Sequence, residues 1–288
     1  MAAKAKDTRP LLVVDGDSFA HRAYHGVPKS VRRKGGKAGN AILGFTNYLV
    51  RLIEAEKPRA VFVGWDNLSE DNWRAKELDG YQGGREMDDE IVEQLDALPE
   101  FIASFGFTYG KGRAYEADDY IASAATAEEK AGGTALVASG DRDSFQLASR
   151  HITILQPVKA GEIARIGPAE VVERYGVNPE QVPDFIALRG DPSDKIPGAK
   201  GVGAVTAASL LKKYPTLEAM LHDGKFETQA DDLRLYKRIA TMVRDIKLPT
   251  IASAEPDWQA ASEKARNWEL NGLADRLAQI AGKSGAES

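Results

Sequence analysis

The sequence contains no cysteine, and this absence excludes several kinds of chemistry at once. Without cysteine there is no disulfide bond, no thiolate nucleophile and no cysteine-ligated zinc, so a bound metal must be a hard cation held by oxygen. Histidine is also scarce, with four residues in 288, which leaves little room for histidine-based catalysis. We expect a cytoplasmic protein.

Long apolar runs are missing as well. No stretch of 18 apolar residues occurs, and the first ten residues lack the apolar segment of a secretion signal, so neither a membrane span nor secretion is expected. The chain is 43% apolar and 28% charged, as in ordinary globular proteins, and at this length about three-quarters of the unfolded surface can be buried. One large domain, alone or with a small satellite, is expected.

An excess of basic residues is the third absence. The chain has 38 Lys and Arg against 43 Asp and Glu, which gives a net charge of −5 at pH 7. This balance argues against binding to nucleic acid by bulk attraction, so a polyanionic partner must be met by a local feature.

Short apolar runs alternate with helical patterns in the first half of the chain. The runs at 11–14, 60–65, 105–109, 135–138 and 152–155 have the length of buried parallel strands. Residues 41–53 and 116–131 have the patterns of intervening helices, and the alternation predicts an α/β fold with helices flanking a parallel sheet.

Helical patterns replace the strand pattern after Pro168. They cover 169–175, 182–188, 204–214, 217–221 and 233–248. We therefore expect an α/β core over 1–175, a helical region over 176–256, and a last segment over 257–288 that packs back on the sheet and ends in a frayed tail.

Acidic residues follow three of the predicted strands. They are Asp15, Asp66, and Asp141 with Asp143. A single Asp after a strand is commonly a turn former or helix cap, but the carboxyl ends of parallel strands meet at one edge, where ligands bind. Two more acidic groups follow in the sequence: Glu116, Asp118 and Asp119 at a helix start, and Asp191 with Asp194 in a turn.

Nine clustered carboxylates need positive charge. Each uncompensated charge in such a cleft costs several kcal/mol, and the immediate neighbours supply only Arg142 and Lys195. Mg²⁺ or Mn²⁺ suits a site built from oxygen alone, and two such ions activate a water and stabilise the leaving oxygen of a phosphodiester. The residues alone therefore predict a metal-dependent phosphoryl hydrolase.

Two features indicate nucleic acid. Residues 198–203, Gly-Ala-Lys-Gly-Val-Gly, precede an apolar helix, and the pattern is that of a helix-hairpin-helix turn in which Gly198, Gly201, Gly203 and Lys200 meet a phosphate backbone; a plain tight turn is the alternative. Residues 18–53 contain seven bases and no acid. This run is either a solvated face or a DNA contact, and its candidate residues are Lys29, Arg32, Arg33, Lys34 and Lys37.

These motifs together resemble the bacterial and phage 5′ nucleases, a family that includes flap endonucleases and the 5′-to-3′ exonuclease domain of DNA polymerase I. The resemblance covers about residues 11–250, through Asp15-Gly-Asp17 with Arg22, Asp66, and the groups at 116–119, 139–143 and 190–203. It implies a PIN-like core, a helix-three-turn-helix module and a helical arch over 67–100. With no polymerase domain after Ser288, a stand-alone actinobacterial (mycobacterial) member is expected.

The resemblance also implies a set of ligands. Two or three Mg²⁺ or Mn²⁺ ions are expected, the first held mainly by Asp15, Asp66, Glu116 and Asp118, the second by Asp119, Asp141, Asp143, Asp191 and Asp194. A K⁺ ion is expected at the hairpin turn, near Ser193, Ala199 and Val202.

The implied activity is cleavage of DNA at 5′ flaps, nicks, gaps and 5′ ends, leaving 5′-phosphate and 3′-hydroxyl groups, in Okazaki fragment processing and repair. Arg22 and Arg85 would add positive charge at the scissile phosphate. The expected partners of this monomer are DNA, including RNA-primed 5′ strands, and a sliding clamp or DNA polymerase I, in the nucleoid and away from membranes.

The arch departs from the family pattern. The family motif Tyr-Lys-x-x-Arg is here Tyr81-Gln82-Gly-Gly-Arg85, so Gln82 stands in place of the lysine that grips DNA with Tyr81 and Arg85. Residues 67–100 also hold eleven acids against three bases. An acidic arch repels a threaded strand, and we expect weaker threading, an arch that is open or mobile without substrate, and Gln82 as a handicap.

Two other functions remain open from the residues. A PIN-type ribonuclease would use the same acids but has no need of the glycine-rich hairpin. A non-catalytic protein that binds DNA structures would need the hairpin but gains nothing from nine carboxylates that face phosphate.

Overall fold

A six-stranded sheet forms the centre of the computed structural model, which describes residues 7–67, 72–82, 87–112, 114–158 and 161–284. The strand order is β5 (Thr108–Lys111), β4 (Ala60–Trp65), β1 (Leu11–Asp15), β6 (Ala135–Ala138), β7 (Ile152–Pro157) and β8 (Ile163–Ile166). The first five are parallel and β8 is antiparallel. The α/β class expected from the sequence is confirmed; β8 was not predicted.

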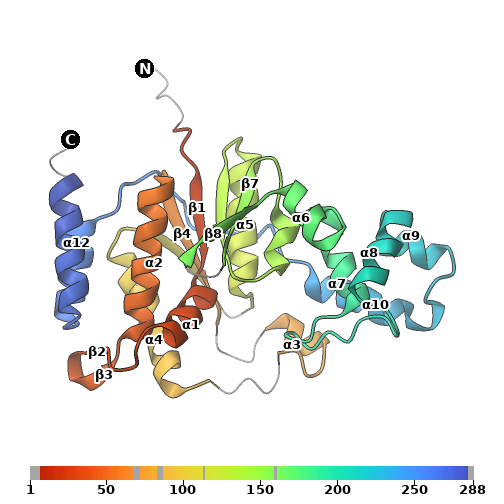
Figure 1. The fold of residues 1–288 in the computed structure, drawn as a ribbon, viewed down its shortest axis with the longest axis horizontal. Coiled ribbons are helices and arrows are strands. Elements are labelled where there is room, and N and C mark those ends of the chain that lie inside the picture. Colours follow the sequence, from red (N-terminus) through yellow and green to blue (C-terminus); the bar gives the residue numbers. More distant parts are fainter. Residues whose placement is uncertain (1–6, 68–71, 83–86, 113, 159–160, 285–288) are drawn as a thin grey trace.

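Alternate residues of the central strand enter different cores. Leu11 and Val13 of β1 pack on one side with α5 (Ala117–Lys130), while Leu12 and Val14 pack on the other. The second side is covered by α1 (Gly16–Gly26), α2 (Asn40–Glu56), α4 (Asp89–Ala103), α11 (Trp258–Asn267) and α12 (Asn271–Ser284). Figure 1 shows α2 and α12 on one side of the sheet and α5 on the other. Burial on both faces explains why the strands are almost wholly apolar.

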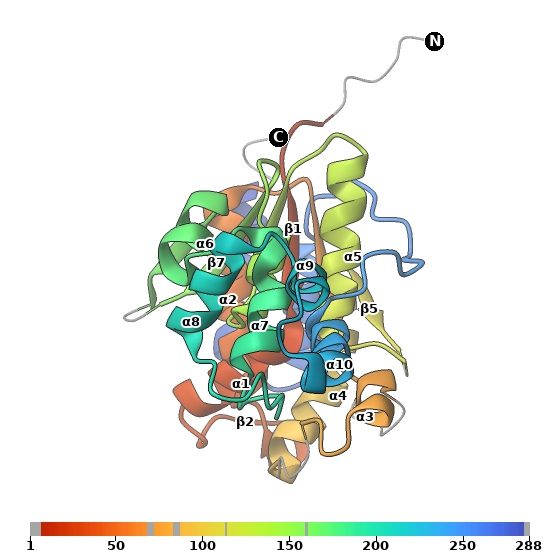
Figure 2. The same ribbon diagram turned by 90° about the vertical axis from the view of Figure 1, so that its right-hand side faces the viewer.

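Short helices continue from the α5 side of the sheet. They are α6 (Pro168–Tyr175), α7 (Val182–Arg189), α8 (Ala204–Lys213), α9 (Leu217–His222) and α10 (Ala230–Ala240). Their apolar residues join the core beneath α5, and Figure 2 shows the group α7 to α10 facing the viewer. No helix in the described ranges has both the length and the apolar composition needed to cross a membrane.

Two predicted elements have different bounds in the structure. The strand expected at 105–109 is β5 at Thr108–Lys111, because Phe105 and Phe107 pack into the core before the strand begins. The helix expected at 233–248 ends at Ala240.

Side chains of the α/β core explain the early end of α10. The amides of Met242, Val243 and Ile246 donate to Gln146 Oε1 (3.0 Å), Asp119 Oδ1 (2.8 Å) and Ser123 Oγ (3.1 Å). These bonds replace the helical hydrogen bonds with tertiary ones and hold the chain in extended form beside α5.

The carboxyl ends of the parallel strands lie at the lower edge in Figure 1, where α1 begins and where α3 (Trp73–Glu77) lies across from α10. A small hairpin of β2 (Arg32–Arg33) and β3 (Lys37–Ala38) lies at the same edge. This edge therefore collects the ends of three central strands, the start of α5 and the turn after α7.

Candidate carboxylate site at the sheet edge

The site begins where the three central strands end. Asp15 is the last residue of β1, Asp66 follows β4, and Asp141 lies three residues after β6. Because β1 lies between β4 and β6, their carboxylates meet at one place. Burial raises the pKa of Asp15 to about 7, and the charges of Asp66 and Asp141 add to this shift.

Asp15 also has a local structural role. Its side chain caps α1 by accepting from Ser18 N (3.0 Å), and its other oxygen accepts from Ser139 Oγ (2.7 Å). The helix-cap interpretation of a strand-end Asp is thus correct for Asp15 as local structure. The cap leaves this carboxylate buried beside its acidic neighbours, so the structural and chemical roles coexist.

Asp17 is a buried acid whose role the sequence pattern does not predict. Its Oδ2 accepts from the backbone N–H of Asp66 at 2.6 Å, which fixes the turn after β4. Burial, and then the charge of Asp66, raise its pKa well above the ordinary value. Its place two residues after Asp15 was visible in the sequence, but nothing there distinguished a residue that holds a neighbouring loop from a ligand.

Glu116 is held by three side chains from the segment around α3. Asn72 Nδ2 donates to one oxygen, while Arg74 Nη1 (3.0 Å) and the Tyr81 hydroxyl (3.2 Å) donate to the other. Burial raises the pKa of Glu116 to about 7 although the charge of Arg74 opposes this shift. The predicted arch segment therefore reaches the site directly, and Tyr81, expected to contact DNA, contacts a carboxylate.

Asp118 and Asp119 are adjacent in the sequence but have different hydrogen-bonding environments in the structure. Asp118 Oδ1 is buried and has no hydrogen-bond partner among the described residues. Burial, followed by the charges of Asp15, Asp141, Asp66 and Glu116, raises its pKa well above the ordinary value. A buried, unpaired carboxylate oxygen among like charges is costly unless a cation meets it.

Asp119, in contrast, is fully satisfied by protein groups. Arg74 binds it through two nitrogens at 2.7 Å each, and the backbone amides of Val243 (2.8 Å) and Glu116 (3.3 Å) also donate to it. The side chain is completely buried. This arrangement gives the carboxylate its own cation, and it differs from the environment expected of a metal ligand.

Asp141 and Asp143 lie in the turn that follows β6. The backbone N–H of Asp143 donates to Asp141 Oδ1 (2.9 Å), and that of Asp141 donates to Ser139 Oγ (3.0 Å). Burial, then the charges of Asp141, Asp194 and Asp191, raise the pKa of Asp143 well above its ordinary value. This acid therefore connects the strand-edge carboxylates to those of the turn after α7.

The turn after α7 supplies the last two acids. Asp191 accepts from Ser193 N (2.8 Å) and from the Ser193 hydroxyl, and it forms an ion pair with Arg189 (3.2 Å). Asp194 Oδ1 accepts from Gln82 Nε2 at 3.1 Å. Gln82, the residue expected to replace a DNA-gripping lysine, thus lies against a site carboxylate.

The donor set fits hard divalent cations. The residues that meet at this edge offer carboxylate oxygens, several are buried with raised pKa values, and Asp118 retains an unpaired oxygen. Within the described ranges, no three acidic or histidine side chains are already arranged closely enough to hold an ion. The chemistry of the donors suits Mg²⁺ or Mn²⁺.

The glycine-rich turn between α7 and α8 is tightly packed. Gly198 has φ of 77°, and a Cβ at this position would come within 2.4 Å of Gly190 N, so no other residue fits. Gly201 has φ of 76° and faces open space, and Gly203 is the N-cap of α8.

Lys200 is exposed in this turn, and its amide donates to Gln229 Oε1 (3.1 Å). Backbone bonds fold the turn: Ala199 N donates to Leu188 O, and Val202 N donates to Ala199 O.

Acids of α4 neutralise most of the basic run. Ion pairs join Lys29 to Asp88, Arg32 to Glu90, and both Arg33 and Lys37 to Glu93. Lys34 is exposed at the hairpin, and its amide donates to Trp268 O (2.9 Å). Arg22 is exposed on α1, while Arg85 lies outside the described residues. The basic run and the acidic stretch, which the sequence presents as separate features, are partners.

Comparison with known proteins matches two family models to adjoining parts of the chain. Residues 10–176 match the 5′-3′ exonuclease, N-terminal resolvase-like domain, and residues 177–262 match the 5′-3′ exonuclease, C-terminal SAM fold. DNA polymerase I of Mycobacterium tuberculosis is 38% identical over 258 residues, which cover 88% of this chain. The same match covers 28% of that polymerase, so the chain corresponds to little more than a quarter of it.

Solved structures have the same fold. A phage T5 flap endonuclease, in a pseudo-enzyme–product complex with DNA and metal ions, superposes with a TM-score of 0.66 at 16% identity, covering 95% of this chain and all of that one. Flap endonuclease-1 from Methanococcus jannaschii gives a TM-score of 0.62 at 14% identity, covering 96% and 94% of the two chains.

Proposed function

The chain belongs to the 5′-3′ exonuclease family, and from that membership and the carboxylate site we propose that it is a structure-specific 5′ nuclease that hydrolyses DNA phosphodiesters. Its substrates are 5′ flaps, nicks, gaps and 5′ ends. The observation that carries the proposal is the meeting of acids from four chain segments around Asp118, whose buried oxygen has no partner in the described residues.

We assign cation binding to eight of the nine acids. Asp15, Asp66, Glu116 and Asp118 would hold one divalent ion, and Asp141, Asp143, Asp191 and Asp194 a second. When bound, such ions neutralise phosphate charge, activate a water and stabilise the leaving oxygen. Mg²⁺ and Mn²⁺ both suit these donors, and a third ion remains part of the proposal.

Asp119 is assigned a positioning role instead. Its bidentate contact fixes the guanidinium of Arg74, which also donates to Glu116 and to the carbonyl oxygens of Ile239 and Thr241. Arg74 thereby joins α3, the start of α5 and the end of α10 at one point. Asp119 acts on the reaction through Arg74, by keeping Glu116 and the base of the arch in place.

Positive groups around the acids would meet the phosphate. Arg22 on α1 is exposed, and we propose that it and Arg85 bind the scissile phosphate. Tyr81 orients Glu116, and Gln82 orients Asp194. The absence of a lysine at position 82 places more of the charge neutralisation on the bound cations.

The glycine-rich turn would bind the duplex at a distance from the phosphodiester that is cut. The backbone can approach a phosphate closely at Gly201 and Gly203, beside the exposed Lys200. Such contacts are blind to sequence, as a structure-specific enzyme requires. We propose that main-chain carbonyl groups of this turn, near Ser193, Ala199 and Val202, bind K⁺.

The cellular setting follows from the proposed substrates. The protein would act as a monomer in the cytoplasm at the nucleoid, on DNA and RNA-primed 5′ strands of replication and repair intermediates. A sliding clamp or DNA polymerase I would deliver these substrates.

One assay tests the proposed function. A labelled 5′-flap duplex and a matched RNA strand are incubated with the protein and Mg²⁺, Mn²⁺ or EDTA, and both cleavage and retention are read. Cation-dependent cuts at the flap junction are expected. Binding without cleavage under every condition, or cleavage of the RNA alone, would contradict the proposal.

A further inference from the structure

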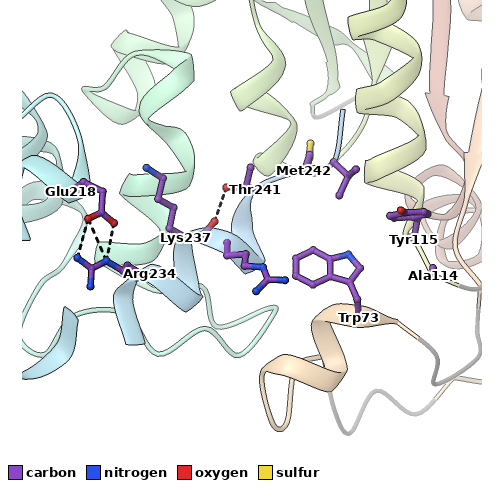
Figure 3. A pocket seen from close by; sticks show the side chains of 10 residues that line it. Trp73, Ala114, Tyr115, Glu218, Arg234, Lys237, Thr241 and Met242 are labelled. Atoms are coloured by element: carbon purple, nitrogen blue, oxygen red, sulfur yellow. Dashed lines mark hydrogen bonds and ion pairs between the residues drawn. The ribbon is translucent and has the colours of Figure 1, made fainter. Parts of the chain in front are cut away.

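A cavity of about 660 Å³ lies between α3 and α10. Its lining includes Trp73 from α3, Tyr115 before α5, and Met242 after α10 (Figure 3). Its volume lies in the range of about 300–1,000 Å³ that is typical of small-ligand pockets. We call this cavity the α3–α10 pocket.

The pocket and the carboxylate site share a wall. Trp73 precedes Arg74, which binds Glu116 and Asp119, and Tyr115 precedes Glu116 itself. Val243, on the third side, donates its amide to Asp119. Residues that line the pocket are therefore adjacent in the chain to residues that bind the acids, and the Arg74 guanidinium lies 4.7 Å from the centre of the Trp73 ring. We infer that a strand cut at the acids reaches the pocket with its neighbouring nucleotides.

Basic residues of α10 form one rim of the pocket. Arg234, Lys237 and Arg238 line it, at spacings of three and four that place them on one face of the helix. All three have acidic partners: Glu218 for Arg234, Asp184 for Lys237 and Glu77 for Arg238.

Two of these ion pairs can exchange an acid for a phosphate at little cost. The Arg234 and Arg238 side chains are 48% and 65% exposed, and exposed ion pairs contribute little to stability. Lys237 is different, because its partner Asp184 is 2% exposed and would be left as a buried charge. The rim therefore offers two guanidinium groups to a polyanion.

Aromatic rings beside exchangeable arginines are a recurring means of holding single-stranded nucleic acid. Bases of any identity stack on the rings, and the cations follow the phosphates. The Trp73 ring projects into the pocket with Arg238 above it, 5.4 Å from the ring centre. An apolar peptide would use the rings but has no need of the arginine rim.

We propose that the α3–α10 pocket binds a base of the single-stranded 5′ strand, next to the phosphodiester that is cut. The proposal rests on the proposed nuclease function and adds to it a base-stacking subsite. The pocket thereby distinguishes a 5′ flap from a nick, which has no unpaired 5′ nucleotides to place there.

The test compares KM for a 5′-flap substrate with KM for a nicked duplex, as a ratio, in wild type, Trp73→Leu and Arg234→Gln. Arg266→Gln is the matched control, because Arg266 is also an exposed arginine paired with an acid, Asp275, but lies on α11. Both pocket variants should raise the flap-to-nick ratio, Trp73→Leu by at least about fivefold. The control should leave the ratio at the wild-type value.

Abasic nucleotides placed one at a time in the flap provide a second readout. In wild type, one position should raise KM, because its base no longer stacks; in Trp73→Leu that dependence should disappear. The pocket proposal would be overturned if the flap-to-nick KM ratio were the same in wild type and both pocket variants and no abasic position raised KM. It would also be overturned if the pocket variants raised KM equally for the flap and for the nicked duplex. Loss of all cleavage in wild type would instead overturn the proposed function.

Discussion

Two groups of acids lie at the same edge of the sheet and have opposite surroundings. Asp88, Glu90 and Glu93, at the start of α4, are paired with cations of the loop 29–37. Among the acids of the carboxylate site, Asp15 and one oxygen of Asp118 are buried, and burial followed by the charges of neighbouring acids raises the pKa of both groups. The comparison shows that an acidic stretch in the sequence does not indicate whether its charges are neutralised in the folded protein. Neutralisation depends on whether the fold places a basic side chain next to each acid.

Asp119 differs from the other acids of the site because the buried Arg74 is its counterion. Removing this counterion should give the largest effect on stability. Replacing Arg74 with Met should lower the free energy of unfolding by about 3–5 kcal/mol, because it leaves a buried carboxylate unpaired. Arg32→Gln, which breaks the exposed pair with Glu90, should cost no more than about 1 kcal/mol. Urea unfolding followed by circular dichroism measures both. A cost for Arg74→Met as small as that for Arg32→Gln would mean that Asp119 does not depend on its arginine.

The unpaired acid should matter for chemistry rather than for folding. Asp118→Asn should reduce the rate of 5′-flap cleavage by at least about a hundredfold, since loss of a ligand exceeds the cost of losing a group that merely supports one. Glu90→Gln, at an acid with its own cation, should change the rate less than about twofold. Single-turnover cleavage with saturating enzyme separates the rate of the cut from binding, and full activity in Asp118→Asn would refute the cation assignment.

Position 82 tests whether adding a cation to the site improves it. Gln82→Lys should increase the flap cleavage rate by about fivefold, because an ammonium group next to Asp194 adds a charge-assisted contact for the phosphate. Gln82→Met, which cannot donate to Asp194, serves as the control and should not increase the rate. An unchanged or lower rate in Gln82→Lys would show that Gln82 is no handicap.

The smallest effect concerns pH at the start of α4. Hydrogen bonds from Tyr24, the Glu90 amide and Lys29 lower the pKa of Asp88 to about 2. A lowered folded-state pKa means that the contribution to stability is complete above the ordinary value near 4, and is lost as the pH falls through about 2. An NMR titration of the Asp88 carboxyl carbon checks this, and Tyr24→Phe should move its midpoint upward. A midpoint near 4 in wild type would show that the contacts are not formed in solution.

Local patterns predicted the five parallel strands, one of them with shifted bounds, and the place where their acids meet, because a parallel sheet brings its carboxyl ends to one edge. They could not predict that α10 ends at Ala240, because the amides that follow it bond to Gln146, Asp119 and Ser123, more than 90 residues away in the chain. The different environments of Asp118 and Asp119 could not be predicted from the sequence either. Both residues sit in the first turn of α5, and only the position of Arg74 decides which acid is neutralised.

Long-range ion pairs join the acidic stretch to the basic run, a relation that the sequence does not reveal. Asp88 and Glu93 are separated from Lys29 and Arg33 by about 60 residues, a distance over which sequence alone gives no contact. The expectation that the basic residues contact DNA remains a prediction, and so does weaker threading through the arch. To contact these basic residues, a DNA strand would have to displace the acids at the start of α4 that pair with them.

Binding of Mn²⁺ to the metal-free protein tests the central claim most directly, because it does not depend on cleavage. Mn²⁺ at a hundred times its dissociation constant should stabilise the wild type by about 2.7 kcal/mol. Glu90→Gln should gain the same stabilisation, and Asp118→Asn much less, as measured by thermal unfolding together with calorimetric titration. Equal Mn²⁺ affinity in wild type and Asp118→Asn would contradict the account, since it would place the cations elsewhere than at the strand-edge acids around Asp118.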